Sequence, residues 1–262
     1  MNLNKWRNIR GLLLALVLIT PLLPIAFWSI ANRWQYPHPW PQVLGAQGGR
    51  NFFSTGGIAA ITNSVIIGLA VTLAAVPLSF MASWALHHYQ GWTLKIFEVI
   101  LFLPLFIPPF VLVMGVTTGS ITFNLPLGIA VIVTLTVLAL PYTAYIFRSA
   151  LINYGSAWEE EGKLLGANET QLFIHIRIPM LRNAFLAASL VAFLVGWSDY
   201  IVTLTIGGGQ LLSLPLFLGS SASGPGNDSL VAVMSFVSIL IPVLIAASIR
   251  VMANKGSGRR MQ

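Results

Sequence analysis

The chain has 262 residues, of which 56% are hydrophobic and 8% are charged, and it contains no cysteine. Soluble domains carry roughly a quarter charged residues, so this composition excludes an ordinary water-soluble fold and favours a helical bundle in a bilayer. The net charge of +7 does not indicate a nucleic-acid-binding protein, because the basic residues lie between apolar runs and form no polar face with interleaved aromatic residues. Without cysteine, disulfides, thiolate catalysis and cysteine metal sites are excluded.

Six apolar stretches approach the length of about 20 residues that a helix needs to cross a bilayer. We predict a transmembrane helix at each of them, at residues 11–28, 58–86, 96–116, 125–147, 183–206 and 230–251. The alternative for the first stretch is a cleaved signal peptide, because basic residues precede it. Pro21 and Pro24 interrupt its apolar run and no clear small-residue cleavage site follows, so we expect a retained helix.

The basic residues predict the orientation, because cytoplasmic loops of membrane proteins are rich in Lys and Arg. With the N-terminus in the cytoplasm, only Arg33 and Arg50 lie outside. Twelve basic residues then lie inside: Lys5, Arg7, Arg10, Lys95, Arg148, Lys163, Arg177, Arg182, Arg250, Lys255, Arg259 and Arg260. Both termini are therefore expected in the cytoplasm. Trp28, Trp34 and Trp40 surround the outer end of the first span, where aromatic rings favour the membrane interface.

The six spans divide the chain into three expected parts. Residues 1–57 hold the first helix and an outer loop, residues 58–252 form a core of five helices, and residues 253–262 form a basic cytoplasmic tail. The core contains one long cytoplasmic loop, at residues 149–182.

This inner loop is where acidic residues concentrate. It holds four of the seven carboxylates of the chain, at Glu159, Glu160, Glu161 and Glu169. Apolar residues recur there at helical spacing, so we predict two short amphipathic helices joined around Gly166 and Asn168, the second ending at Pro179. The alternative is that the loop is charged and helical only because it faces water.

The loop also resembles the EAA signature of binding-protein-dependent permeases, in which a glutamate and two small residues precede a glycine and then an Ile-x-Leu-Pro. The matching residues are Glu160, Gly166, Ile176 and Pro179. Glu161 and Gly162 stand where the family usually has two alanines, and Ile178 where it usually has leucine. The resemblance covers the chain from about residue 60 to 250, through Asn63-Ser64, Leu103-Pro104, Ile107-Pro108-Pro109 and Leu140-Pro141-Tyr142.

The resemblance implies an all-α, polytopic membrane protein with the MetI-like, type I ABC importer permease fold, in the bacterial cytoplasmic (inner) membrane. It implies that the inner loop couples this chain to a cytoplasmic ATP-binding-cassette ATPase dimer. The residues expected to couple are Glu160, Glu161, Gly162, Gly166, Ala167, Ile176 and Pro179. The further partners implied are a second permease subunit, identical or homologous, and an extracytoplasmic solute-binding protein.

No catalytic residue, metal site or cofactor is expected on this chain, and ATP and Mg²⁺ are assigned to the partner ATPase. Gly162-Lys163 is not a P-loop, because Leu164 follows it and Ala157 stands where the first glycine is needed. The four histidines show no metal-ligand spacing.

Asp199 is the candidate residue for the solute pathway, because an ionisable group inside a membrane span costs roughly 2.5 to 3.5 kcal/mol and is usually functional. Gly196, Tyr200 and Thr203 share a helical face with it. The predicted pathway residues are Trp197, Asp199, Tyr200 and Thr203. The alternative is that Asp199 accepts hydrogen bonds from neighbouring helices and only fixes packing.

The solute is predicted from a narrower resemblance to polyamine permeases, with relatives for thiamine, iron(III) and phosphonates. It rests on Ser198-Asp199-Tyr200, on Ser213-Leu214-Pro215-Leu216 and on Arg33-Trp34-Gln35-Tyr36-Pro37. An ammonium group offers charge-assisted hydrogen bonds to a buried carboxylate, so a polyamine such as putrescine or spermidine is preferred.

Two other classes of protein are less consistent with the sequence. An ion-coupled secondary transporter would use Asp199 as its ion site but has no reason to carry an ATPase-docking loop. An intramembrane enzyme would need a nucleophile in the serine-rich residues 219–224, which are predicted to form an outer loop and have no histidine after them. The prolines at positions 104, 108, 109 and 141 are predicted to be tolerated within helices, the alternative being breaks that line a cavity.

Overall fold

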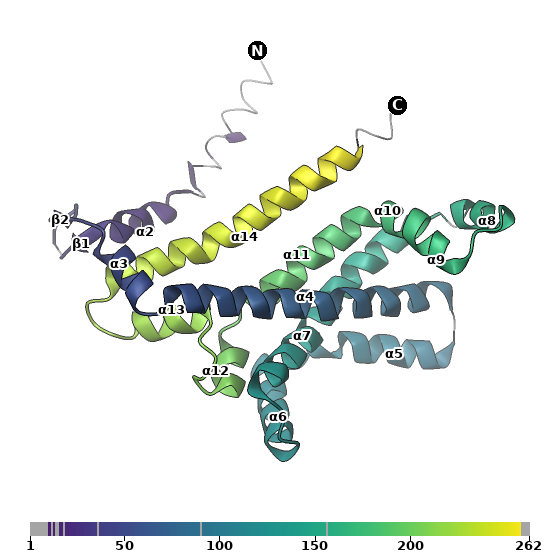
Figure 1. The fold of residues 1–262 in the computed structure, drawn as a ribbon, viewed down its shortest axis with the longest axis horizontal. Helices are drawn as coiled ribbons and strands as arrows, with labels where there is room; N and C mark the ends of the chain where they lie inside the picture. The colour runs from purple at the N-terminus through teal and green to yellow at the C-terminus, as the bar shows by residue number, and fades with distance from the viewer. Residues whose placement is uncertain are drawn as a thin grey trace, which may run out of the picture. The chain divides into compact units, whose positions relative to one another are not determined.

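The computed structural model describes residues 10–11, 13, 16–17, 19–35, 37–89, 91–155 and 157–257, the last five by their backbone alone. Most of the described residues are helical (Figure 1). The chain forms two compact units. One unit comprises Met1–Ile61 with Leu214–Ile241, and the other Thr62–Ser213 with Pro242–Gln262.

The first unit contains the predicted outer loop. Its elements are α2 (Leu22–Ser29), β1 (Ala31–Arg33), β2 (Val43–Leu44), α3 (Gln47–Ser54), the first turn of α4 (Gly57–His88), α13 (Leu214–Ala222) and the first half of α14 (Asp228–Ser257). β1 and β2 pair antiparallel, with Ala31 opposite Leu44. Next to this pair, the rings of Trp28 and Trp34 lie 5.1 Å apart between their centroids.

The serine-rich residues 219–224 were predicted to form a loop, and this prediction is wrong for residues 219–222. α13 extends to Ala222, so Ser220 and Ser221 are helical. Ser220 donates its hydroxyl hydrogen bond to the carbonyl of Phe217 in the preceding turn. The helix therefore continues into a segment whose Gly and Ser content suggested a turn.

The second unit contains the cytoplasmic loop and most of the membrane core. After most of α4 it runs through α5 (Trp92–Phe102), η1 (Leu103–Leu105), α6 (Pro109–Thr122), α7 (Leu127–Ile152), α8 (Ala157–Leu164), α9 (Glu169–Leu172), the π-helical η2 (Phe173–Arg177), α10 (Ile178–Met180), α11 (Arg182–Ser198) and α12 (Ile201–Gly207). α7 and α11 make the main helix pair of this unit. Phe80, Leu135, Phe147 and Val202 are buried in its apolar core.

Three helices in the described part of the chain are each long and apolar enough to cross a membrane alone: α4, α7 and α14 to Met252. They confirm the predicted helices at residues 58–86, 125–147 and 230–251. The predicted span at residues 11–28 falls partly outside the described residues, and its described end is α2. The predicted basic residues Lys5, Arg7, Arg259 and Arg260 also lie outside them, and Lys255 is described by its backbone alone.

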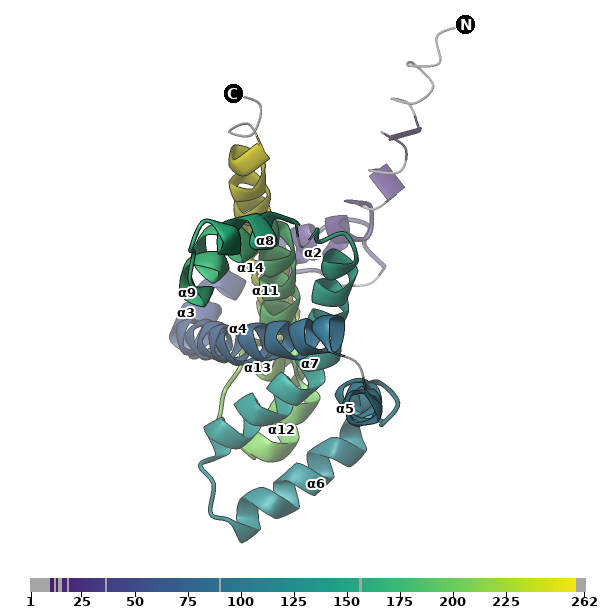
Figure 2. The same ribbon diagram turned by 90° about the vertical axis from the view of Figure 1, so that its right-hand side faces the viewer.

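The helix predicted at residues 96–116 is instead two helices that meet at an angle of 103° (Figure 2). Pro104 lies in η1, Pro108 lies directly before α6, and Pro109 is the first residue of α6. Each proline lacks an N–H donor and disfavours helical backbone in the residue before it, so three within six residues end the helix. Pro77 and Pro141 stand alone and remain inside α4 and α7. The prediction that prolines are tolerated is therefore correct for Pro141 and wrong for the cluster.

The predicted helix at residues 183–206 is also discontinuous. α11 ends at Ser198, Asp199 is extended with ψ 132°, and α12 begins at Ile201. A second bend of 75° separates the helical run Glu169–Met180 from α11. This bend falls at Leu181, two residues after Pro179, where the second helix of the loop was predicted to end.

Two glycines bring α4 and α11 into close contact. A Cβ atom on Gly196 would lie 2.8 Å from the Cα of Gly68, and one on Gly68 would lie 2.8 Å from the ring of Phe193. Small residues allow membrane helices to approach to backbone contact. Gly196 therefore faces α4, which corrects the prediction that it shares a pathway face with Asp199.

Candidate functional site

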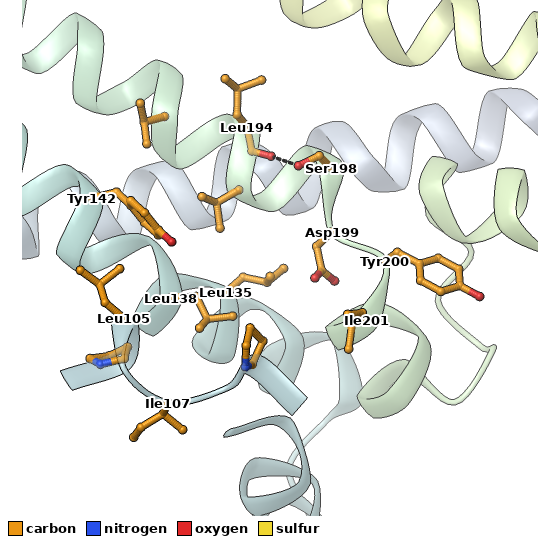
Figure 3. Close-up of a pocket in the computed structure, with 14 residues that line it drawn as sticks. Leu105, Ile107, Leu135, Leu138, Tyr142, Leu194, Ser198, Asp199, Tyr200 and Ile201 are labelled. Carbon is orange, nitrogen blue, oxygen red and sulfur yellow. Dashed lines mark hydrogen bonds between the residues drawn. The ribbon is translucent and has the colours of Figure 1, made fainter. Parts of the chain in front are cut away.

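The helix breaks at residues 103–108 and 199–200 lie on one cavity of about 750 Å³ within the second unit. α7 completes its wall, so three separate stretches of chain form it. The lining residues are Pro104, Leu105, Ile107, Pro109, Leu135, Leu138, Tyr142, Val191, Leu194, Val195, Ser198, Asp199, Tyr200 and Ile201 (Figure 3). Discontinuous helices around a cavity are a common way for transporters to expose polar groups at membrane depth.

Asp199 is the acidic residue in this mostly apolar lining. Its Oδ2 atom accepts hydrogen bonds from the backbone N–H of Thr203 at 2.8 Å and from the Thr203 hydroxyl at 3.0 Å. Its Oδ1 atom accepts a longer one, 3.4 Å, from the N–H of Val202. These bonds cap the first turn of α12. Their donors, Val202 and Thr203, belong to α12 itself, whereas the packing alternative expected donors on neighbouring helices.

The other predicted pathway residues have different environments. Tyr200 lines the cavity, but its ring points away from Asp199 (Figure 3). Thr203 is buried and binds the Asp199 carboxylate. Trp197 is 2% exposed and stacks on Phe193, with ring centroids 5.9 Å apart, so it belongs to the packing of α11.

Tyr142 is a cavity residue that sequence reasoning did not select. Its hydroxyl points into the cavity from α7 (Figure 3). The available signal was a polar aromatic residue directly after Pro141 in a predicted membrane span. It adds a hydroxyl and a ring face to the wall that contains Asp199.

The predicted coupling residues form a helix, a turn and a further helix. α8 ends at Leu164, and Gly166 takes the left-handed conformation with φ +84°. The N–H of Ala167 donates to the carbonyl of Gly162 at 2.9 Å, which closes the end of α8. Asn168 then caps α9 through a capping box with Gln171. Gly166 and Asn168 thus supply the turn chemistry predicted for them.

An apolar surface is exposed at this turn. We name it the coupling surface and define it by Trp158, Leu164 and Leu165, which are 62%, 89% and 83% exposed. Glu160 and Glu161 are exposed on the same short helix. Beside them lies a shallow pocket lined by Leu165, Gly166, Ala167, Gln171, Leu172, His175 and Ile176. Large exposed apolar residues next to charges are typical of a protein interaction site.

Gly162, one of the departures from the family pattern, has a local reason. A Cβ atom there would lie 2.8 Å from Leu172 Cδ2 and 3.0 Å from Ile176 Cδ1. α8 therefore packs more closely on the following helical run than an alanine would allow without a shift of those two side chains. Pro179 is exposed and lies within α10.

Glu159, which precedes the EAA-like residues, is buried, and sequence reasoning did not select it. Arg177 donates to its two oxygens, from Nε at 3.0 Å and from an η nitrogen at 2.9 Å. The Tyr154 hydroxyl also donates to it. Burial raises the pKa of Glu159, but the hydrogen bonds from Arg177 and Tyr154 and the positive charges of Arg177 and Lys163 together outweigh burial and hold this pKa below its usual value. Glu159 is thus ionised and paired at neutral pH.

No group of three or more His, Asp or Glu side chains that could hold a metal ion occurs among the residues that the structure describes. The cavity has a mostly apolar wall with the Asp199 carboxylate, and the coupling surface combines exposed apolar side chains with Glu160 and Glu161. This arrangement suits solute passage and subunit contact.

The family model for the inner membrane component of binding-protein-dependent transport systems matches residues 75–255. The chain belongs to this family. It is thus a membrane permease subunit of a transport system, and its several apolar helices agree with a multi-pass protein of the inner membrane. The matched region includes both helix breaks and the coupling surface.

Among characterised relatives, the inner membrane ABC transporter permease protein YnjC of Escherichia coli K12 is 26% identical over 190 residues, covering 72% of this chain and 35% of YnjC. A homologue of the spermidine/putrescine permease PotC from Mycoplasma pneumoniae is 28% identical, covering 56% and 54%. The trehalose permease SugB of Mycobacterium tuberculosis is 25% identical, covering 76% of each chain. The chain thus spans about a third of YnjC and about half of the PotC homologue.

Solved transporter structures share the fold. A bacterial alginate ABC transporter, in complex with a periplasmic protein that holds an alginate pentasaccharide, superposes with a TM-score of 0.67 at 12% identity, covering 96% of this chain and 95% of that one. The MetNI methionine ABC transporter in an inward-facing conformation gives 0.61 at 14% identity, covering 76% and 95%. These likenesses show that the permease has the ABC importer fold.

Proposed function

We propose that this permease imports a small organic cation, best represented by a polyamine such as putrescine or spermidine, by alternating access driven by a separate ATPase. The proposed complex contains a cytoplasmic ATP-binding-cassette ATPase dimer, a second permease subunit and an extracytoplasmic binding protein. ATP and Mg²⁺ bind to the ATPase, and this chain holds no cofactor. Two findings support these kinds of partner. The family is that of binding-protein-dependent systems, and the alginate ABC transporter that shares the fold was solved in complex with a periplasmic protein.

The proposed topology has six spans with both termini in the cytoplasm. The bent pair of α5 and α6 then counts as one crossing, α11 with α12 counts as another, and the first span lies at residues 11–28. The parts remain those of the sequence: residues 1–57, the core at 58–252 with its loop at 149–182, and the tail at 253–262. The excess of Lys and Arg on the proposed inner side supports this orientation.

The Asp199 carboxylate on the cavity wall is the observation that carries the choice of a cation. It accepts hydrogen bonds from Val202 and Thr203, and a carboxylate offers about four acceptor positions, so it can accept another bond from an ammonium group. The apolar lining suits the methylene groups of a polyamine, and the Tyr142 ring offers a face to its charge. The PotC relatives support the same solute.

The coupling surface is proposed to dock on the ATPase, with Glu160, Glu161, Gly162, Gly166, Ala167, Ile176 and Pro179 forming or shaping it. Leu164 and Leu165 supply the exposed apolar area for this contact. Closure of the ATPase dimer would move this surface and rotate the helices around the cavity between an inward-open and an outward-open state.

Uptake by the reconstituted complex in proteoliposomes tests the solute. Labelled putrescine, spermidine, thiamine and trehalose are offered with binding protein outside and ATP inside, and wild type is compared with Asp199→Asn. We expect the variant to lose uptake of the cations by about tenfold or more, since removal of one charged partner typically costs over 1.4 kcal/mol. Asp228→Asn, the same change at an exposed acid, is the matched control.

Other solutes give different outcomes. Selective uptake of trehalose with no effect of Asp199→Asn would overturn the cation proposal and favour the sugar relatives. Uptake of iron(III) or a phosphonate in place of the four solutes would place the chain in another branch. Uptake driven by an ion gradient without ATP would support the secondary transporter that the sequence left as an alternative.

A further inference from the structure

Arg177 lies at the centre of a cluster that joins the inner loop, residues 149–182, to the end of α4. The cluster contains Trp84 from α4, Tyr154 after α7, Glu159 from α8, Glu169 from α9 and Arg177 from η2. We propose that Arg177 is a positioning residue that fixes the coupling surface to α4, so that displacement of that surface moves α4 with it. This inference rests on the proposed function for the source of the force.

The contacts of Arg177 satisfy its guanidinium from several directions. Besides its two bonds to Glu159, an η nitrogen donates to Glu169 at 2.9 Å. The guanidinium carbon lies 4.4 Å from the centre of the Trp84 ring. The side chains of Arg177 and Glu159 are 13% and 7% exposed, so water screens this pair little. Two parallel bonds between a guanidinium and a carboxylate fix orientation as well as distance.

The surface ion pair on the same loop differs from this arrangement. Lys163 and Glu169 are 3.8 Å apart, and their side chains are 55% and 69% exposed. Exposed pairs of this kind stabilise little, because solvent screens them and both side chains must be ordered. The rigidity of the loop is therefore expected to depend on Arg177 and Glu159.

The π-helical turn matches the spacing of aromatic residues on α4. Phe173 packs on Phe80 with ring centroids 5.9 Å apart, and four residues later in each segment Arg177 covers Trp84. Single π-helical turns are rare and occur often at functional sites. η2 therefore contacts α4 at two successive positions.

The cluster also fastens the end of α7. Tyr154 donates its hydroxyl to Glu159, and its ring lies edge-on to Trp84 with centroids 5.6 Å apart. One set of contacts thus joins three elements: α4, the end of α7 and the inner loop. A push on the coupling surface cannot separate them without breaking a buried ion pair, which is costly because it leaves an unpaired charge.

α4 links this cluster to the cavity. Its Gly68 meets Gly196 of α11 at backbone contact, and Gly196 lies three residues before Asp199. Asn63, near the start of α4 in this unit, donates to the carbonyl of Leu212 beyond α12 at 2.9 Å. A movement of α4 would therefore reach the segments on both sides of the helix break that bears Asp199.

The absence of cysteine allows a direct test of the positioning role. Leu164→Cys on the coupling surface and His87→Cys near the end of α4 are spin-labelled in the full chain, and the distance distribution is measured by double electron–electron resonance. We expect one narrow distribution in the parent protein and a broad one in Arg177→Lys, because lysine keeps the charge but not the two-pronged geometry. Trp84→Leu should broaden it as well.

The matched controls are Arg148→Lys and Glu98→Gln. Arg148 of α7 pairs with Glu98 of α5 and lies over the Phe102 ring at 5.8 Å, so it is a guanidinium–carboxylate pair beside an aromatic ring that does not contact α4 through these groups. These variants should leave the measured distribution narrow. A narrow distribution in Arg177→Lys and Glu159→Gln would overturn the inference, whatever the chain transports.

Transport by the complex supplies the second measurement. In Arg177→Lys, we expect solute uptake per ATP hydrolysed to fall by about tenfold, within the usual range for coupling between two sites, while ATPase binding persists. Broad distances with unchanged uptake per ATP would overturn the coupling role. If wild type itself shows no ATP-driven uptake, the proposed function fails, and the spin-label result still decides whether Arg177 positions the loop.

Discussion

The carboxylate of Asp199 accepts two hydrogen bonds from Thr203, one from its backbone N–H at 2.8 Å and one from its hydroxyl at 3.0 Å. The same carboxylate lies on the wall of the cavity (Figure 3). One side chain therefore both caps α12 and places a carboxylate on the wall. The two roles can be separated, because asparagine caps a helix about as well as aspartate but carries no charge.

We predict that Asp199→Asn changes the free energy of unfolding by less than about 1 kcal/mol but greatly reduces cation uptake. Thr203→Val should lower the free energy of unfolding by about 1 kcal/mol, because it removes one hydrogen bond. It should leave cation uptake nearly unchanged, because the Asp199 carboxylate stays in place. Thermal unfolding of the purified chain and uptake by the complex check the pair. Equal losses of stability and uptake in both variants would show that Asp199 only supports α12.

A second prediction concerns the turn at Gly166, whose φ is +84°. Valine there should cost roughly 1 to 3 kcal/mol of strain and displace the coupling surface, whereas asparagine tolerates the left-handed region. Nothing lies within 4 Å of a Cβ atom at this position, so the two variants differ in backbone preference and not in clashes. The amount of ATPase that co-purifies with each variant is the measurement. Similar retention of the ATPase by the valine and asparagine variants would contradict a role for this turn geometry.

Sequence alone predicted α4, α7 and α14 because each contains a long apolar run with a single proline inside it. It did not predict the break between α5 and α6, where the apolar run continues while Pro104, Pro108 and Pro109 lack backbone donors. The cluster was visible, but its effect depends on whether a cavity or protein surface satisfies the freed carbonyl groups.

The candidate site was predictable to a similar extent. Asp199 was identified from its charge and Gly166 from its turn chemistry, since both signals are local. The contact of Arg177 with Trp84 joins residues 93 positions apart in the sequence, and no local pattern reports such a pairing. Tyr142 and Glu159 were missed for the same reason, because their importance follows from which helices pack beside them.

A third prediction concerns the contact of α4 with α11. Gly196→Ala should destabilise the protein by about 1 to 3 kcal/mol, because its Cβ atom would meet the backbone at Gly68, which cannot rotate away. Gly115→Ala in α6 is the matched control, since nothing lies within 4 Å of a Cβ atom there. Unfolding temperatures of both variants in one detergent provide the comparison. A stable Gly196→Ala variant would show that the two helices separate at low cost.

The last prediction concerns pH and the ion pair of Glu159 with Arg177. Burial raises the pKa of Glu159, but hydrogen bonds from Arg177 and Tyr154, together with the positive charges of Arg177 and Lys163, lower this pKa below the ordinary value of 4.5. A carboxylate with a lowered folded-state pKa stabilises the protein fully above its unfolded-state pKa, and it loses that contribution as the pH falls through the folded-state value. The stabilisation by Glu159 should therefore be complete above about pH 4.5 and disappear in more acidic solution.

The difference in unfolding temperature between wild type and Glu159→Gln, measured from pH 7 down to about pH 3, isolates this contribution from the other carboxylates. We expect a large difference at neutral pH that shrinks as the acid range is entered. Glu161→Gln, at an exposed position of the same helix, should give a small difference throughout. If the difference for Glu159→Gln stays constant across this range, Glu159 contributes by packing and its charge does not stabilise the loop.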